Sequence, residues 1–263
     1  MNCNQACEFN AEEQRDHIID WIKDYFAKEG PDAKAVIGIS GGKDSTIAAA
    51  LLVRALGRDK VVGVLMPNGT QSDITDSKRV CEYLSIPSYE INIGSACNAL
   101  YRAIDEGYDF DKQCNQNPMV STNTPARLRM TTLYAVAALV HGRVCCTGNR
   151  SERYVGYTTK FGDSAGDFAP LLDYTVKELL LIGDTLDLPT DLVHKTPSDG
   201  MCGASDEDNL GFTYEELDNF LIDKTRPNYD SYKKIVQRHK TSEHKRRAMP
   251  ACDNTSDRNY IAF

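Results

Sequence analysis

A glycine-rich segment gives the clearest sign of chemistry in this sequence. Residues 38–45 read Gly-Ile-Ser-Gly-Gly-Lys-Asp-Ser. Glycines let a backbone turn tightly and approach a ligand closely, and the unpaired amides at a helix start favour anions. Ser40 and Ser45 add hydroxyl donors, and Lys43 adds a positive charge. We therefore predict that nucleotide phosphates bind to Gly38, Ile39, Ser40, Gly41, Gly42, Lys43, Asp44 and Ser45.

The aspartate in this segment makes the expected phosphate site dependent on a cation. A carboxylate repels phosphate oxygens unless a divalent cation lies between them, and a Mg²⁺ ion bound to both resolves the conflict. The segment is not a Walker A loop, because Lys43 is followed by Asp44 and the position five before Gly42 holds Ile37. It does not match GxGxxG either. The sequence thus predicts a magnesium–nucleotide site of another type.

The phosphate segment lies between an expected strand and an expected helix. Residues 35–39 are apolar and β-branched, as in buried parallel strands, and the Ala/Leu-rich residues 45–56 end at Gly57. Alternating strands and helices predict an α/β fold, a Rossmann-like doubly wound parallel sheet with helices on both faces and ligands at the carboxyl ends of the strands. Further strands are expected at 61–66, 88–93 and 143–147, and further helices at 11–28, 73–84, 95–105 and 125–141.

The second half of the chain has a different character. Residues 148–172 are rich in Gly, Asp, Thr and Ser and predict a loop of about 25 residues, a length that is usually functional or disordered. Glu152 follows the fourth expected strand, so strand-end geometry can bring it near Asp44 to form a Mg²⁺ site. The alternative is a loop carboxylate paired with Arg150 or Arg153. Helices are expected at 173–195, 213–223 and 229–240, with a loop at 196–212 and a polar, extended tail.

Composition excludes several classes of protein. A net charge of −8 argues against a general nucleic-acid-binding surface, which is usually basic. No stretch approaches the roughly 20 apolar residues that span a bilayer, and the N-terminus lacks an apolar signal-peptide core. We expect a cytoplasmic protein that binds neither nucleic acid nor membrane. Its nine cysteines are expected to be reduced.

The phosphate segment resembles the pyrophosphate-binding loop of the N-type ATP pyrophosphatases, an adenine nucleotide alpha hydrolase-like group. Further motifs, taken in order, are similar to those of the short, ammonia-dependent NAD synthetases, and they cover nearly the whole chain after residue 35. They are ARLRM (126–130), CTGNRSE (146–152), GYTTKFGDSAGD (156–167), KTPSDG (195–200), SDEDNLGFTYEELDNFL (205–221) and EHKRR (243–247). The resemblance implies a single domain over 1–263, with an N-terminal helix at 11–29, a nucleotide-binding core at 34–147, and substrate loops and C-terminal helices at 148–263.

The resemblance also implies a reaction and a set of residue roles. ATP adenylates the nicotinate carboxylate of deamido-NAD, and ammonia then gives NAD, AMP and pyrophosphate. The implied catalytic residues are Lys43, Asp44 and Asp167, and the implied Mg²⁺ ligands are Asp44 and Glu152. Further ATP contacts would come from Thr147 and Ser198, and deamido-NAD contacts from Arg127, Lys160, Asp167, His244 and Lys245. Asp167 could accept a hydrogen bond from a ribose or position ammonia. A homodimer is also implied.

The chain departs from the family pattern at two places. The family has a lysine where this chain has Val176, and Lys177 lies one residue later, which on a helix turns the side chain by about 100°. The family's PTADL segment is PSDGM here, so Ser198 replaces a threonine. Two other functions stay open: a relative acting on RNA, such as a tRNA-lysidine synthetase, would want a broad basic surface, and a non-catalytic adenine-nucleotide sensor would not need Glu152.

Overall fold

The computed structural model describes residues 9–71, 74–107, 116–195 and 205–251. Within them lies one four-stranded sheet in the order β3-β2-β1-β4, and every pair of neighbouring strands is parallel. The strands are β1 (Lys34–Gly38), β2 (Val61–Leu65), β3 (Ser88–Glu90) and β4 (Gly142–Cys145). Since the chain moves from β1 to β2 on one side and returns to β4 on the other, the carboxyl ends of β1 and β4 form the switch point where such sheets bind ligands. The predicted doubly wound parallel sheet is confirmed.

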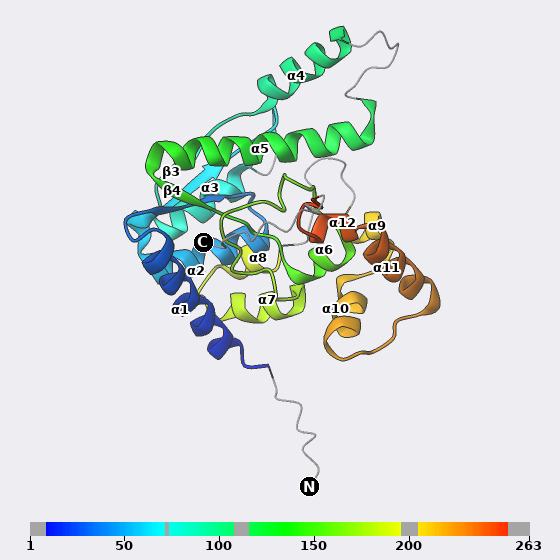
Figure 1. Ribbon diagram of the computed structural model, residues 1–263. Helices are drawn as coiled ribbons and strands as arrows, with labels where there is room; N and C mark the ends of the chain where they lie inside the picture. The colour runs from blue at the N-terminus through cyan, green and yellow to red at the C-terminus, as the bar shows by residue number, and fades with distance from the viewer. Residues whose placement is uncertain (1–8, 72–73, 108–115, 196–204, 252–263) are drawn as a thin grey trace, which may run out of the picture.

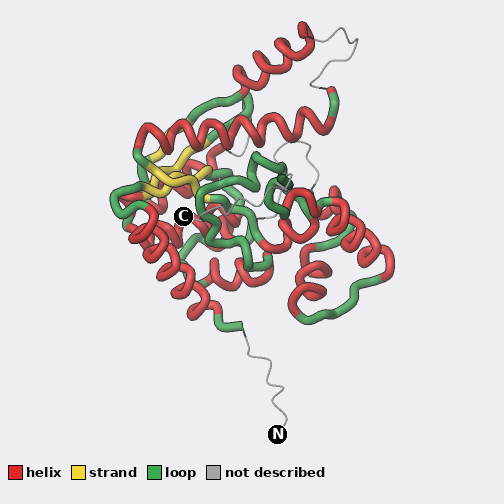
Figure 2. Tube along the Cα trace, viewed as in Figure 1, coloured by secondary structure: helices red, strands yellow, loops and turns green. Residues whose placement is uncertain are grey.

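Helices cover both faces of the sheet, as Figures 1 and 2 show. Neighbouring residues of β1 point to opposite sides: Ile37 packs with Leu51 in one apolar cluster, and Val36 packs with Leu133 in another. One face is covered by α1 (Ala11–Glu29), α2 (Lys43–Leu56), α3 (Ile74–Leu84), α7 (Val176–Asp184) and α8 (Thr190–Val193). The other face is covered by α4 (Gly94–Gly107) and α5 (Pro118–Val140), and a short 3-10 helix, η1 (Arg58–Lys60), precedes β2.

A third apolar cluster joins the later helices, which lie together at the side of the molecule in Figure 1. These helices are α6 (Arg150–Val155), α9 (Asp206–Leu210), α10 (Tyr214–Ile222) and α11 (Tyr229–Thr241), and α7 adds Val176. The short α12 (Glu243–Arg246) has no residue in this cluster and contacts α11. The carboxylate of Asp218, 1% exposed, ties α10 to the starts of two other helices. It accepts hydrogen bonds from Ser151 Oγ of α6 at 2.5 Å and from the Lys177 amide of α7 at 2.7 Å.

The 148–172 segment is not the uninterrupted loop that its composition predicts, because it contains α6. Asn149 and Glu152 form a reciprocal capping box at the start of this helix, and Gly156 ends it in a left-handed conformation with φ +65°. Such caps satisfy the unpaired groups of a short helix. Glu152 therefore belongs to the first turn of a helix, where its position is fixed.

Other element boundaries also differ from the prediction. The helix expected at 173–195 is divided into α7 and α8, because Asp187 has φ +56° and Pro189 follows it. Helix α5 begins at Pro118, seven residues before the expected start at Pro125, which lies inside the helix. The third strand is shorter than expected: β3 has three exposed residues.

None of the described helices combines the length and the hydropathy that crossing a bilayer requires. Four of the cysteines lie buried and unbridged in the described part of the chain: Cys81, Cys97, Cys145 and Cys146. Burial raises the pKa of all four thiols. Each of these thiols therefore stays protonated and unreactive at neutral pH.

Helix α7 offers a matched test of the core. Leu179 is fully buried in the apolar cluster that includes Ile37 and Leu51, whereas Leu181 on the same helix is 44% exposed. Replacing Leu179 by Ala leaves a cavity, so we expect the free energy of unfolding to fall by about 2–5 kcal/mol. Leu181→Ala should lower it by less than about 1 kcal/mol. Urea unfolding followed by circular dichroism measures both changes, and equal losses would contradict this packing.

Candidate functional site

The 38–45 segment forms a tight turn from the end of β1 into α2. Two serines hold its shape: Ser45 Oγ lies 3.0 Å from Ser40 Oγ and donates to Gly42 O at 3.1 Å, while Gly42 N donates to Ser40 Oγ at 3.2 Å. Gly41 has φ +79°, and a Cβ there would lie 3.0 Å from the Ser77 amide nitrogen. Only glycine meets both constraints without strain. In this conformation the serine hydroxyls bind the turn itself.

Lys43, the first residue of α2, is 5% exposed and is surrounded by compensating groups. Its Nζ donates to Asp44 Oδ2 at 3.0 Å and lies 5.6 Å from the centre of the Tyr214 ring. Burial alone would lower the pKa of Lys43, but the charges of Asp44 and Glu152 outweigh burial and raise it. The lysine therefore carries a fixed positive charge beside the turn.

The buried Asn149 contacts both Asp44 and Glu152, and its backbone N–H donates to Glu152 Oε2 at 3.3 Å. Asn149 Nδ2 donates to Asp44 Oδ1 at 3.4 Å, and Asn149 Oδ1 accepts from the Glu152 amide at 2.9 Å. Burial, followed by the nearby charge of Asp44, raises the pKa of Glu152 to about 8. Two acids that repel each other in this way form a site that favours a cation. The described residues contain no group of three His, Cys, Asp or Glu side chains suited to holding a metal.

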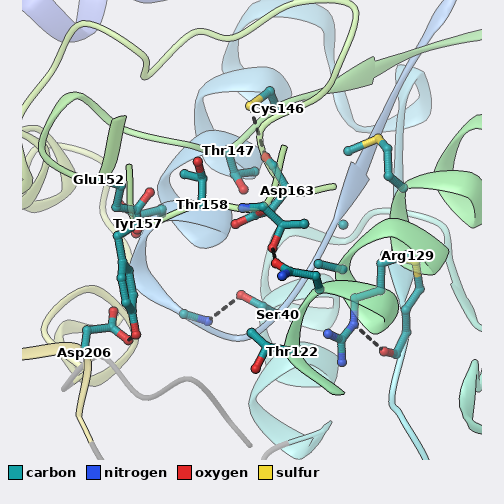
Figure 3. A pocket seen from close by; sticks show the side chains of 18 of the residues that line it. Ser40, Thr122, Arg129, Cys146, Thr147, Glu152, Tyr157, Thr158, Asp163 and Asp206 are labelled. Atoms are coloured by element: carbon teal, nitrogen blue, oxygen red, sulfur yellow. Dashed lines mark hydrogen bonds between the residues drawn. The ribbon is translucent and has the colours of Figure 1, made fainter. Parts of the chain in front are cut away.

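A cavity of about 670 Å³ opens above these groups, a size typical of small-molecule sites. Figure 3 shows Glu152, Tyr157 and Asp206 on one side of it and Arg129 on the other. A smaller cavity of about 160 Å³ adjoins it at the turn. The predicted residues that line one cavity or both are Gly38, Ile39, Ser40, Gly42, Lys43, Asp44, Ser45, Thr147, Glu152 and Lys245.

The basic residues expected to hold deamido-NAD fall into two groups, one that lines the cavity and one that lies beside it. Lys245 lines the cavity, and its Nζ donates to Gly156 O at 2.8 Å and Thr158 O at 2.6 Å. The others do not line the cavity but form a chain beside it: Arg127 Nε donates to Lys160 O at 3.2 Å, and Lys160 Nζ donates to His244 O at 2.8 Å. All of these acceptors are backbone carbonyls, so the lysine and arginine charges are not neutralised by them.

The predicted Asp167 and the displaced Lys177 lie apart from the cavity, and one predicted residue lies outside the described residues. Asp167 Oδ2 accepts from the Val144 amide at 2.7 Å, and Tyr134 donates to Asp167 Oδ1 at 3.3 Å. Its carboxylate thus fastens a loop to the end strand of the sheet. Lys177 Nζ donates to Asn219 Oδ1 at 3.2 Å, away from the cavity. Ser198 falls in the segment 196–204, outside the described residues.

Sequence reasoning missed several polar residues that line the cavities or hold residues lining them. Asn149 could have been found, because Asn-x-x-Glu is a helix-capping signature. Asp163, whose Oδ1 accepts from the Thr159 amide at 2.6 Å, borders both cavities. Asp206 lines the larger cavity and accepts from the Tyr157 hydroxyl at 3.3 Å. Asp206 reaches the site from a segment that is distant in the chain from Tyr157, and the local sequence holds no signal for this contact.

A parallel α/β sheet with a glycine-rich turn and a lysine at its carboxyl edge defines a class of nucleotide-binding enzymes. Residues 15–249 match the family model described as NAD synthase. The chain belongs to the NAD synthase family, whose members are ligases, as the resemblance in its motifs indicated.

Individual relatives agree with this assignment. An NH3-dependent NAD+ synthetase of Methanosarcina mazei is 32% identical over 255 residues, which cover 91% of this chain and 97% of the relative. A solved structure of NMN synthetase from Francisella tularensis is similar with a TM-score of 0.84 and 34% identity, covering 94% of this chain and all of the other. NAD+ synthetase from Burkholderia pseudomallei follows with a TM-score of 0.73 and 29% identity, covering 90% of each chain.

The raised pKa of Glu152 predicts a pH dependence of stability. The folded protein holds this proton up to about pH 8, whereas the unfolded chain releases it near the ordinary glutamate pKa of 4.5. The stabilisation that comes from the protonated Glu152 is therefore complete below its unfolded pKa of 4.5. It is lost as the pH rises through its folded pKa of about 8.

Urea unfolding in metal-free buffer should show the free energy of unfolding falling between about pH 5 and pH 8. Glu152→Gln should flatten this slope, because the amide does not titrate. The exposed Glu215 on α10 provides the control, since Glu215→Gln should keep the wild-type slope. An unchanged slope in Glu152→Gln would contradict the assignment of this titration to Glu152.

Proposed function

We propose that this protein is an ammonia-dependent NAD synthetase. One observation carries the proposal in a chain that matches the NAD synthase model over residues 15–249. The turn at residues 38–45, called the phosphate turn below, lines the same cavity as Glu152 and Lys245. The substrates would be ATP, deamido-NAD and ammonia, and the products NAD, AMP and pyrophosphate. A homodimer and a cytoplasmic location are part of the same proposal and rest on the family resemblance.

The phosphate turn would hold the β- and γ-phosphates of ATP. Amides at the start of α2 and the fixed charge of Lys43 favour anions there. The nicotinate carboxylate would attack the α-phosphorus, forming an acyl-adenylate and releasing pyrophosphate. Ammonia would then attack the activated carbonyl, and AMP would leave. Lys43 stabilises charge on the leaving group, and the remaining contribution of the protein is to position two nucleotides.

Asp44 and Glu152 suit a Mg²⁺ ion. Their donor atoms are oxygens. Burial, followed by repulsion from Asp44, raises the pKa of Glu152, and a cation would stabilise both carboxylates. Magnesium at phosphate sites commonly takes one or two carboxylates and completes its shell with phosphate and water, so two protein ligands suffice. When bound, the ion would neutralise charge on the phosphates. Asn149 holds Asp44 in place, and the capping box holds Glu152.

Lys245 and its neighbours would hold the second nucleotide. Deamido-NAD carries a pyrophosphate and a carboxylate, which basic side chains recognise. Lys245 lines the cavity directly, and Arg127, Lys160 and His244 form the hydrogen-bonded chain beside it. We propose that these residues bind the anionic groups of the substrate where it leaves the cavity. For Asp167 the proposed role is indirect, through the loop that it fastens to Val144.

The experiment is a defined assay with purified protein, ATP, MgCl2, ammonium and deamido-NAD. The proposal expects AMP and NAD to form in equal amounts, measured by chromatography, and no ADP. An enzyme acting on RNA would form AMP only when tRNA is added, and a nucleotide sensor would bind ATP and form neither product. Either result, or release of ADP, would overturn the proposal.

A second substrate has support from one observation. The solved structure with 34% identity and a TM-score of 0.84 is an NMN synthetase, whose product is a mononucleotide. The same adenylation and amidation chemistry would serve nicotinate mononucleotide, since the reacting carboxylate is identical. Competition between the two acids at equal concentration measures the ratio of their kcat/KM values. A ratio favouring the mononucleotide would replace deamido-NAD in the proposal and leave the chemistry unchanged.

Asp44→Asn tests the magnesium and phosphate role. The amide keeps the size of the side chain but loses the charge, so we expect kcat/KM to fall by about 100-fold or more while circular dichroism shows the secondary structure of the wild type. Asp16→Asn, on the exposed surface of α1, is the matched control and should keep full activity. Ammonia-dependent amide formation at the wild-type rate in Asp44→Asn would remove Asp44 from the metal site.

A further inference from the structure

One buried hydroxyl in the wall of the cavity has no partner. Ser77 is 1% exposed, and within the described residues its Oγ is the one buried side-chain nitrogen or oxygen without a hydrogen bond. Buried polar groups are nearly always paired, because leaving one unpaired is costly. Ser77 lines the larger cavity, so a ligand bound there can supply the missing partner.

The position of Ser77 places this hydroxyl beside the phosphate turn. Ser77 lies in the first turn of α3, an eleven-residue helix that begins at Ile74. A Cβ at Gly41 would lie 3.2 Å from Ser77 Oγ, so the turn packs directly on the start of this helix. Helix starts carry partial positive charge and attract anions. The phosphate turn therefore lies between two helix starts, those of α2 and α3.

A lysine completes this side of the cavity. Lys195 lines the cavity, and its Nζ donates to Asp76 Oδ2, one residue before Ser77, at 2.7 Å. Asp76 also pairs with Arg79 at 3.5 Å, and Arg79 pairs with Asp191 at 2.8 Å. This network balances the charge of Asp76 and fixes the lysine. An ammonium group has three N–H donors, so one contact leaves donors for an anion.

We propose that Lys195 and Ser77 form an anion subsite that takes the pyrophosphate portion of ATP, together with the turn at Gly41. The proposal rests on the proposed function for the identity of the ligand. We assign the pyrophosphate end of ATP to this subsite because Ser77 packs against the phosphate turn at Gly41. Lys177 does not contribute to this subsite, because its Nζ donates to Asn219 outside the cavity. In the reaction the subsite would hold the leaving pyrophosphate and leave the nicotinate end to Lys245.

Calorimetric titration of the full chain with inorganic pyrophosphate and MgCl2 tests the subsite without requiring turnover. We expect Lys195→Gln and Ser77→Ala each to weaken pyrophosphate binding by about tenfold or more, the effect of losing one hydrogen bond to a charged group. Lys177→Gln is the matched control and should bind within about twofold of the wild type. AMP, which lacks the leaving group, should bind all four proteins equally.

Melting temperatures measured without ligand separate binding from folding. Ser77→Ala removes an unpaired buried hydroxyl, so it should melt at the wild-type temperature or higher while binding pyrophosphate more weakly. Lys195→Arg keeps the charge and should retain most of the binding that Lys195→Gln loses.

Several outcomes would overturn the subsite: no pyrophosphate binding to the wild type, unchanged binding in both variants, or an equal loss in the Lys177→Gln control. Unchanged binding in Ser77→Ala alone would remove that residue from it. Failure of the proposed function is a separate result, because it would appear as absent NAD and AMP formation while the differences in pyrophosphate binding persist.

Discussion

The structure depends on holding opposite charges close together at the edge of the sheet. Lys43 lies where water is largely excluded, and its charge would be costly there without the neighbouring Asp44 and Glu152. The protein makes the arrangement tolerable by dividing the charges among separate elements. Lys43 and Asp44 begin one helix, Glu152 begins another, and Asn149 connects them. The glycines of the turn matter because they let these helix starts approach one another.

The later part of the chain completes the site formed by the sheet. Tyr214 of α10 covers Lys43, and Asp206 of α9 contributes to the raised pKa of that lysine. Tyr157 joins this group by its hydrogen bond to Asp206. The carboxyl edge of the sheet and the C-terminal helices thus share one cavity. A core without these helices would expose Lys43 to water and lose one side of the site.

The sequence allowed the sheet, its helices and the glycine-rich turn between β1 and α2 to be predicted because their signals are local. The apolar run at 35–39, the glycines that follow it and the Ala/Leu-rich helix are all contiguous. Helix α6 was missed because Gly, Asp and Ser dominate its surroundings, although its Asn149–Glu152 cap was visible in the sequence. The surroundings of Asp167 and Lys177 could not be foreseen, since their partners, Val144 and Asn219, are distant in the chain. Family resemblance supplied roles for such residues but not their contacts.

The link made by Asp218 has a consequence for how the molecule opens. The Asp218 carboxylate of α10 accepts hydrogen bonds from the starts of both α6 and α7. Helix α10 therefore cannot separate from the other two helices unless both hydrogen bonds break. Local opening should then be cooperative across all three helices, which would exchange their amide hydrogens as a single unit. Glu152, in the first turn of α6, therefore keeps its position only while α10 stays in place.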